Sequence, residues 1–180
     1  IFSALTISRS LPKGKGTVIV KHANPCGVSS KKDHLESYKS ALSCDPISAF
    51  GGIVSCNFKI TKNLAEELNK LFLEVVIANG FDSSAIKILK TKKNLRLIDG
   101  TSYTSDELLK FVSFNKDIMI QSEDLNLFSN KNFKIVSKRK PTSKQLKDLI
   151  FAFNICRYVK SNAIVLASNE TTVGIGSGQP

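Results

Sequence analysis

Four short apolar segments alternate with amphipathic segments across residues 17–98, and this alternation constrains the fold more than any other feature. The apolar segments, which predict buried strands, are residues 17–20, 51–56, 74–78 and 94–98. The segments between them carry apolar side chains at helical spacing and are residues 33–44, 63–72 and 82–89. Strands that alternate with helices are typical of layered folds, so the sequence predicts an α/β fold with a mixed or parallel sheet.

Turn and capping signals predict where these elements begin and end. Asn24-Pro25-Cys26-Gly27 predicts a break directly after the first strand, and Asp45-Pro46 predicts the end of the first helix. Asn63 and Glu66 fit a capping box at the start of the second helix. Asp82 is expected to cap the third helix.

Residues 99–180 are expected to complete the first unit and to begin a second. The expected features are irregular structure over 99–132 with a strand near 117–121, a helix over 142–156, and a hairpin of 163–167 with 171–175. Thr142 and Gln145 fit a capping box for that helix. We therefore expect one subdomain over residues 1–137 and the first half of a second over 138–180.

Charge and cysteine content narrow the function classes. The net charge of +11 suits a nucleic-acid surface or an anionic substrate, but a chain rich in Lys also acquires such a charge by composition alone. The run Lys138-Arg139-Lys140 lacks interleaved aromatic residues, so we expect no nucleic-acid partner. No apolar run approaches the length of a membrane span. The four cysteines form no C-x-x-C pair, which favours reduced thiols in a cytoplasmic protein over a zinc site.

Lys21 and His22 directly follow the first predicted strand. Side chains at the carboxyl end of a strand reach the crevice in which α/β proteins bind ligands. A histidine there can transfer a proton near neutral pH, and a lysine can stabilise developing negative charge. Taken alone, however, a histidine is more often structural than catalytic. The only other histidine, His34, lies in a polar stretch and is expected to be solvated.

Four more positions combine a possible ligand contact with an ordinary structural alternative. Phe50-Gly51-Gly52 could let a ligand approach the backbone or could form a tight turn. Glu74 could bind an amine or ribose or could face water, and Asn162 could contact a ligand or cap a helix. Residues 174–179 do not form a G-x-G-x-x-G dinucleotide fingerprint, although a glycine-rich strand could lie close to a ligand.

Five motifs taken in order carry a specific resemblance. They are KHANPCG, DPISAFGGIV, EVVIANGFD-x-x-A, KSNAIV and TVGIGSGQ. Together they closely resemble the formyltransferase domain of the bifunctional purine-synthesis enzyme, a family that formylates 5-aminoimidazole-4-carboxamide ribonucleotide (AICAR) and then closes the ring to inosine monophosphate (IMP). The resemblance runs from about Thr17 to Gln179, with a looser match over 92–137.

The resemblance implies a fold, a co-substrate and a set of site residues. The family's region consists of two cytidine-deaminase-like subdomains without a catalytic zinc, transfers the formyl group of 10-formyltetrahydrofolate, and forms active sites between the subunits of a homodimer. The implied catalytic residues are Lys21, His22 and Asn162. The implied nucleotide contacts are Phe50, Gly51 and Glu74, and the implied folate contacts are Ile47 and Phe50.

Several parts of the family pattern are missing from this sequence. The upstream Arg-Tyr motif, the later segments and the cyclohydrolase domain are absent, and Pro180 stands where the family continues with Ser-Arg. The chain also starts without an initiator Met. We therefore expect a fragment of a longer enzyme with little or no activity by itself. A basic nucleic-acid-binding module and an inactive truncated remnant are the alternative functions.

Overall fold

A five-stranded mixed sheet with the strand order β2-β1-β3-β4-β5 forms the centre of the protein. The computed structural model describes residues 1–103, 109–122 and 126–178. The strands are β1 (Gly16–Lys21), β2 (Asn24–Ser30), β3 (Gly52–Cys56), β4 (Leu73–Ala78) and β5 (Arg96–Asp99). β1 pairs antiparallel with both β2 and β3, whereas β3, β4 and β5 run parallel. The predicted α/β fold with a mixed sheet is confirmed.

Helices cover both faces of this sheet. One core cluster joins Ile19 and Val76 to the helices α2 (His34–Cys44), α3 (Lys62–Leu68) and α4 (Ser83–Leu89). A second cluster joins Val18, Val20 and Ile77 to α1 (Phe2–Ser10) and α5 (Ser143–Cys156). Neighbouring residues of β1 therefore point into different clusters. This two-sided burial explains why the strands are continuous apolar runs rather than alternating ones.

The predicted strands and helices of residues 17–98 are confirmed, but two helix starts differ from expectation. α3 begins at Lys62 after Thr61, so the predicted capping box of Asn63 and Glu66 is wrong. Asp82 does precede α4, yet its side chain caps no backbone N–H. The carboxylate lies 2.6 Å from the ammonium of Lys59 instead, which shows that an ion pair has replaced the cap.

Residues 24–27 were expected to end a strand and instead begin one. β1 and β2 form a hairpin in which Lys21 pairs with Asn24, so His22 and Ala23 are the two central turn residues. Pro25 lies opposite Val20 where the register shifts, and proline is tolerated in strands at such irregularities because it has no N–H to donate. The turn-forming residues therefore fit a strand that lies at the edge of the five-stranded sheet.

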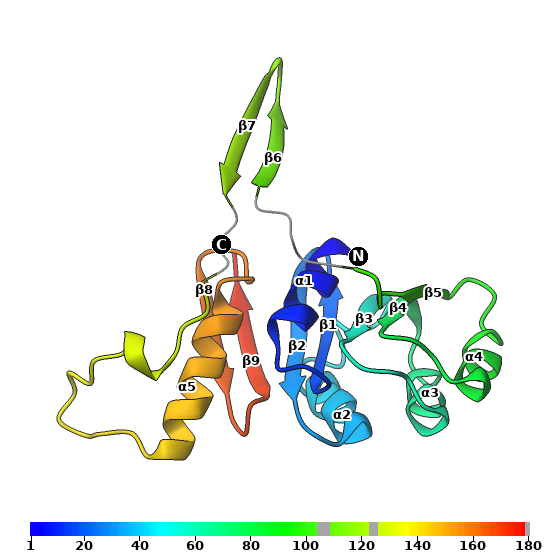
Figure 1. Ribbon diagram of the computed structural model, residues 1–180, viewed down its shortest axis with the longest axis horizontal. Coiled ribbons are helices and arrows are strands. Elements are labelled where there is room, and N and C mark those ends of the chain that lie inside the picture. Colours follow the sequence, from blue (N-terminus) through cyan, green and yellow to red (C-terminus); the bar gives the residue numbers. More distant parts are fainter. Residues whose placement is uncertain (104–108, 123–125, 179–180) are drawn as a thin grey trace.

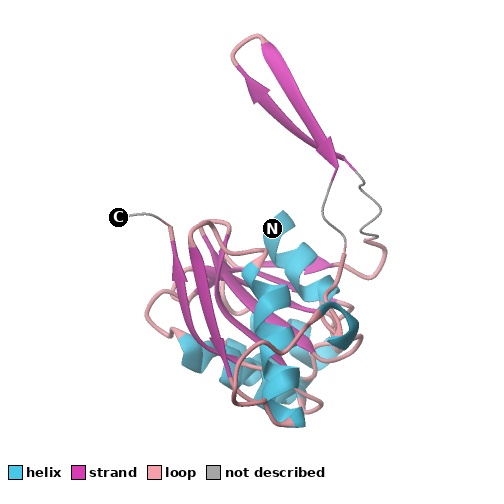
Figure 2. Ribbon diagram, turned by 90° about the vertical axis from the view of Figure 1, so that its left-hand side faces the viewer, coloured by secondary structure: helices cyan, strands magenta, loops and turns pink. Residues whose placement is uncertain are grey.

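The later part of the chain contains two hairpins and the longest described helix. The hairpin of β6 (Leu109–Phe114) with β7 (Asp117–Ser122) projects away from the sheet in both views (Figures 1 and 2). The predicted strand near 117–121 is confirmed, while β6 and the short helix η1 (Asn130–Asn132) lie in a stretch expected to be irregular. Thr142 and Gln145 form the predicted capping box of α5. β8 (Ala163–Ala167) and β9 (Thr172–Ser177) form the second hairpin as predicted.

The second hairpin lies against the edge of the central sheet, with β9 beside β2 (Figure 1). The Thr172 hydroxyl accepts a 2.8 Å hydrogen bond from the Val28 N–H and donates a 3.2 Å bond to the Val28 carbonyl oxygen. Ser29 also forms a β-bridge with Thr171. These contacts hold the start of β9 on β2. Gln179 and Pro180, the end of the glycine-rich motif, lie outside the described residues.

Three further findings concern membranes, thiols and metals. No helix within the described ranges is both long enough and apolar enough to cross a membrane. All four cysteines are free thiols, two of them buried and two half-buried. Within the described part of the chain, no three His, Cys, Asp or Glu side chains are placed to share a metal ion.

Candidate functional site

The sheet topology brings three of the predicted site segments to one edge. β1 runs antiparallel to β3, and β3 runs parallel to β4, so the end of β1 lies beside the starts of β3 and β4. The Lys21 ammonium donates a 2.7 Å hydrogen bond to the Phe50 carbonyl oxygen, and the Gly51 N–H donates a 2.8 Å bond to the Phe72 carbonyl oxygen. Glu74 follows on β4.

These strand ends are not the ones at which ligand binding was expected. Lys21 does lie at the carboxyl end of its own strand, but β1 opposes the parallel strands. The site residues therefore lie at the amino ends of β3 and β4, opposite the edge at which parallel α/β sheets bind ligands. Their proximity depends on the reversed direction of β1, which residue patterns within single strands do not encode.

His22 occupies an unusual backbone conformation. The φ angles of His22 and Ala23 are 52° and 62°, as a two-residue type I′ turn requires at both central positions. Such turns favour asparagine and glycine, because a side chain in the left-handed region costs about 1–2 kcal/mol. The tight turn places His22 directly beside Lys21 at the rim of the sheet, where the His22 side chain is exposed.

A cavity of about 590 Å³ opens between the β1–β2 hairpin and β9. Its lining includes Lys21, His22, Cys26, Cys44, Asp45 and Gly174. Burial raises the pKa of the Cys26 thiol, and the negative charge of Asp45 raises it further. Burial also raises the pKa of the Cys44 thiol. Both thiols are therefore protonated near neutral pH and are poor proton acceptors. The cavity also presents an imidazole at His22, which can transfer a proton, and an ammonium at Lys21, which can stabilise an anion.

The loop between α2 and β3 is held by hydrogen bonds from its backbone amides and presents apolar side chains to solvent. The Asp45 carboxylate accepts a 2.9 Å hydrogen bond from the Ser48 N–H, and the hydroxyl and amide of Ser48 lower the pKa of this carboxyl. Ile47 is 86% exposed and Phe50 is 56% exposed. The Phe50 ring lies 5.0 Å from the Phe72 ring, centroid to centroid. A planar ligand could therefore stack here without displacing core side chains.

Gly51 and Gly52 let this loop pass close to its neighbours. Gly51 has a φ of +70°, a conformation that side-chain-bearing residues rarely adopt. A Cβ atom on Gly52 would lie 2.9 Å from the Ala49 carbonyl oxygen and 3.1 Å from that of Val20. Both glycines are therefore required by the turn, which supports the structural alternative for this motif.

Glu74 and Asn162 lie farther from the cavity. Both side chains are exposed, and neither lines it. Asn162 lies in the connection between α5 and β8, and Lys160 in the same connection contacts the β1–β2 turn. The structure thus brings together Lys21, His22 and Phe50, and it places the connection that carries Asn162 against the same turn.

Two residues that contact this turn had no role in the sequence-based prediction. Asn24 lies at the start of β2, and Lys160 follows α5. The Asn24 side chain accepts a 3.1 Å hydrogen bond from the Lys160 N–H, and the Lys160 ammonium donates a 3.2 Å bond to the His22 carbonyl oxygen. Asn24 belongs to the motif KHANPCG and Lys160 to the motif KSNAIV. Neither motif indicates that the two segments meet, because Lys160 lies 136 residues from Asn24 and 138 residues from His22.

The other histidine is structural. The His34 ring stacks on the Phe58 ring at 3.7 Å between centroids, and its Nε2 lies 3.0 Å from the Gly14 carbonyl oxygen. The expectation that His34 is solvated is therefore wrong, because packing against Phe58 half-buries it. This contact leaves His22 as the histidine that faces a cavity.

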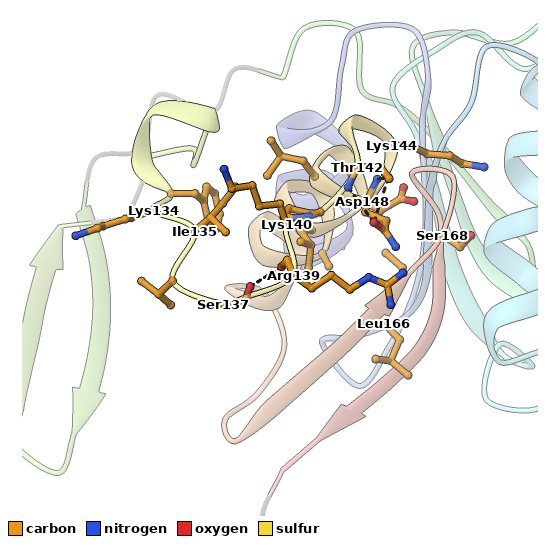
Figure 3. A pocket seen from close by; sticks show the side chains of 18 of the residues that line it. Lys134, Ile135, Ser137, Arg139, Lys140, Thr142, Lys144, Asp148, Leu166 and Ser168 are labelled. Carbon is orange, nitrogen blue, oxygen red and sulfur yellow. Dashed lines mark hydrogen bonds between the residues drawn. The ribbon is translucent and has the colours of Figure 1, made fainter.

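A larger cavity of about 1040 Å³ lies elsewhere, between residues 133–141, α5 and β8. Figure 3 shows Lys134, Arg139 and Lys140 on the loop that borders it and Leu166 on β8. Its walls combine cationic and apolar side chains, but they include none of the predicted site residues. The larger cavity and the predicted site residues are therefore in separate places.

Comparisons with known proteins cover nearly the whole chain. The profile described as "AICARFT/IMPCHase bienzyme" matches residues 2–180. The chain is 45% identical to the bifunctional purine biosynthesis protein PurH of Caldicellulosiruptor saccharolyticus over 163 residues, which are 90% of this chain and 32% of that protein. It is 47% identical to PurH of Buchnera aphidicola subsp. Schizaphis graminum over 164 residues, which are 90% of this chain and 31% of that protein. It is 40% identical to PurH of Bacillus cytotoxicus over 178 residues, which are 98% of this chain and 35% of that protein. The chain thus spans about a third of the length of these relatives.

Proposed function

The chain belongs to the AICARFT/IMPCHase bienzyme family, and from this membership we propose that it contributes the reactive centre that transfers a formyl group from 10-formyltetrahydrofolate to the 5-amino group of AICAR. The relatives are bifunctional purine biosynthesis proteins, so the reaction would serve the synthesis of IMP. One observation carries the proposal. A histidine and a lysine are neighbours in a tight turn that lines a cavity, and the lysine ammonium lies 2.7 Å from the Phe50 carbonyl oxygen.

The proposed chemistry needs a base, a cation and two positioned substrates. The 5-amino nitrogen of AICAR is a weak nucleophile, because its lone pair is delocalised into the imidazole and the carboxamide. His22 accepts the amine proton as the nitrogen attacks the formyl carbon, and Lys21 and Asn162 stabilise the oxyanion of the tetrahedral intermediate. The bond to the folate nitrogen then breaks, and Lys21 supplies the proton for that nitrogen.

The proposed roles correspond to known contributions to lowering an activation free energy. One donor to an oxyanion is typically worth about 2.7–4 kcal/mol, and positioning two reactants can supply about 7–11 kcal/mol. Phe50, Gly51 and Glu74 would contact AICAR, and the exposed side chains of Ile47 and Phe50 would contact the folate ring. The exposed Phe50 ring, which is tilted by 39° against the Phe72 ring, offers an aromatic face to a planar ligand of this kind.

The proposal extends to the architecture of the complete protein, meaning the polypeptide that carries these 180 residues. We assign residues 1–137 to a first cytidine-deaminase-like subdomain and residues 138–180 to the start of a second. A homodimer with shared active sites, a cyclohydrolase activity in the same polypeptide and a cytoplasmic location complete the proposal. The free thiols of all four cysteines suit a reducing compartment.

The test compares the two histidines in the complete protein. Replacing His22→Gln should lower the turnover of formyl transfer by about 10²–10⁴-fold, the range typical for loss of a general base, while AICAR still binds. His34→Gln is the matched control and should keep turnover, because its ring packs on Phe58 away from the cavity. Turnover of the His22 variant near that of the wild type would refute the assignment. RNA binding with a steep salt dependence and no AICAR binding would favour the nucleic-acid alternative.

A further inference from the structure

We propose that Asn24 and Lys160 form a clasp that positions the Lys21–His22 turn against the connection that carries Asn162. The inference rests on the proposed function, because it assigns the clasp a role in formyl transfer. Asn24 and Lys160 are positioning residues in this proposal, since they act through His22 and Asn162. Four hydrogen bonds between segments that are distant in sequence carry the argument.

The Asn24 side chain uses both of its polar ends. Its Oδ1 accepts a 3.1 Å hydrogen bond from the Lys160 N–H, and its Nδ2 donates a 2.9 Å bond to the Ser177 hydroxyl. Lys160 lies in the connection that precedes β8, and Ser177 ends β9, so one amide group contacts both the entry to the second hairpin and its last strand residue. Asn24 is the residue directly after the turn, and it therefore joins the turn to that hairpin at the cavity, which Asn24 and Ser177 both line.

Lys160 makes two further hydrogen bonds that complete the clasp. Its ammonium donates a 3.2 Å hydrogen bond to the His22 carbonyl oxygen, and its own carbonyl oxygen accepts a 3.1 Å bond from the Gly178 N–H. The backbone and the side chain of one residue thus contact the turn at Asn24 and at His22. This double contact restrains the orientation of the turn as well as its distance from the connection.

The clasp has consequences for both proposed catalytic segments. His22 and Ala23 hold left-handed φ angles that neither residue type favours, so contacts outside the turn must help to maintain them. Only Ser161 separates Lys160 from Asn162, so the clasp also restrains where the Asn162 amide can lie. Lys21, His22 and Asn162 come from distant parts of the sequence, and a displacement of about 1 Å between such groups can cost about 10²-fold in rate.

The experiment compares three variants of the complete protein. Asn24→Ala removes both side-chain bonds, and Lys160→Met removes the bond to His22 while keeping the length of the side chain. Asn154→Ala is the matched control. Its half-buried amide also makes two bonds to a distant segment, at 2.9 Å and 3.0 Å to the backbone of Phe128, and it does not line the cavity. Lys160 does not line the cavity either, so its variant separates positioning from direct contact with a substrate.

We expect both clasp variants to lower kcat by about 10- to 100-fold and to change the KM for AICAR by less than about twofold. The control should keep both values, and its loss of thermal stability should match that of the clasp variants. Asn24→Asp should restore most of kcat, because its carboxylate can accept bonds from both the Lys160 N–H and the Ser177 hydroxyl. Values of kcat within about twofold of wild type in both clasp variants would overturn the proposal, as would an equal loss of kcat in the control.

A second measurement separates failure of the clasp from failure of the proposed function. Absence of formyl transfer in the wild-type complete protein would reject the proposed function. Hydrogen exchange of a peptide that spans residues 17–28 would then decide whether the clasp exists. Faster exchange in both clasp variants than in the wild type and the control supports it, and unchanged exchange overturns it.

Discussion

The ammonium of Lys21 donates a 2.7 Å hydrogen bond to the carbonyl oxygen of Phe50, 29 residues later in the chain. This bond joins the end of β1 to the loop that precedes β3. Lys21 is thereby held between the cavity and the exposed rings of Phe50 and Phe72. In the proposed reaction the same ammonium faces the oxyanion, so its position relative to Phe50 determines where the formyl group must lie.

The first prediction concerns this ammonium. Lys21→Met should lower formyl transfer by about 10²–10³-fold, because the oxyanion loses a charged donor. Lys92→Met is the control, since the Lys92 ammonium also donates a 2.7 Å bond to a backbone carbonyl, that of Leu71, but does not line the cavity. Steady-state kinetics in the complete protein measure both. Equal losses of rate in the two variants would indicate that loss of a hydrogen bond from a lysine to a backbone carbonyl, rather than loss of the oxyanion donor, lowers formyl transfer.

The second prediction uses the cysteines as reporters of the cavity. Cys44 and Cys156 are both half-buried, but only Cys44 lines the cavity. AICAR and tetrahydrofolate, which lacks the formyl group, should slow alkylation of Cys44 by iodoacetamide about tenfold or more at concentrations near 100 times Kd, and should leave Cys156 unchanged. Cys56 should react slowest throughout, because complete burial raises its pKa to about 12. Mass spectrometry of the labelled peptides gives the rates. An unchanged rate at Cys44 with both ligands bound would place the substrates elsewhere.

The third prediction concerns the contact between α2 and β2. A Cβ atom on Gly27 would overlap the carbonyl oxygen of Ala41, so α2 must move away from the strand in Gly27→Ala. The free energy of unfolding should fall by about 1–3 kcal/mol, as overpacking typically costs. Gly176→Ala is the matched control, because a Cβ there meets no atom within 4 Å. Urea unfolding measures both. A loss for Gly27→Ala no larger than for the control would contradict the packing described here.

The fourth prediction is a pH dependence from Asp45. The hydroxyl and the amide of Ser48 lower the pKa of Asp45 below its ordinary value of 3.8. The ionised carboxylate therefore stabilises the fold at pH values above about 3.8, and this contribution disappears as the pH falls through the lower folded pKa. Urea unfolding between pH 3 and 7 should show a stability difference between wild type and Ser48→Ala that shrinks at the acidic end. A difference that stays constant down to pH 3 would show that Ser48 does not act through the Asp45 carboxylate.

Local patterns predicted a large share of the fold and part of the candidate site. The strands β1, β3, β4 and β5 and the helix α5 follow from apolar runs, helical spacing and the Thr142–Gln145 capping box, all of which act over a few residues. Motif resemblance also singled out Lys21, His22 and Phe50, which the structure brings to one edge of the sheet. These features are encoded within short segments, so the sequence alone was enough to find them.

Other features were decided only by the tertiary structure. Residues 24–27 carry turn-forming side chains, yet they form a strand because β1 offers them a partner across a two-residue turn. The site lies at the amino ends of β3 and β4 because β1 runs against them. Asn24 and Lys160 meet across 136 residues. Hydrogen bonds and packing between distant segments leave no periodic or capping signal in the chain, so the arrangement of the candidate site emerges only when the sheet and the second hairpin are assembled.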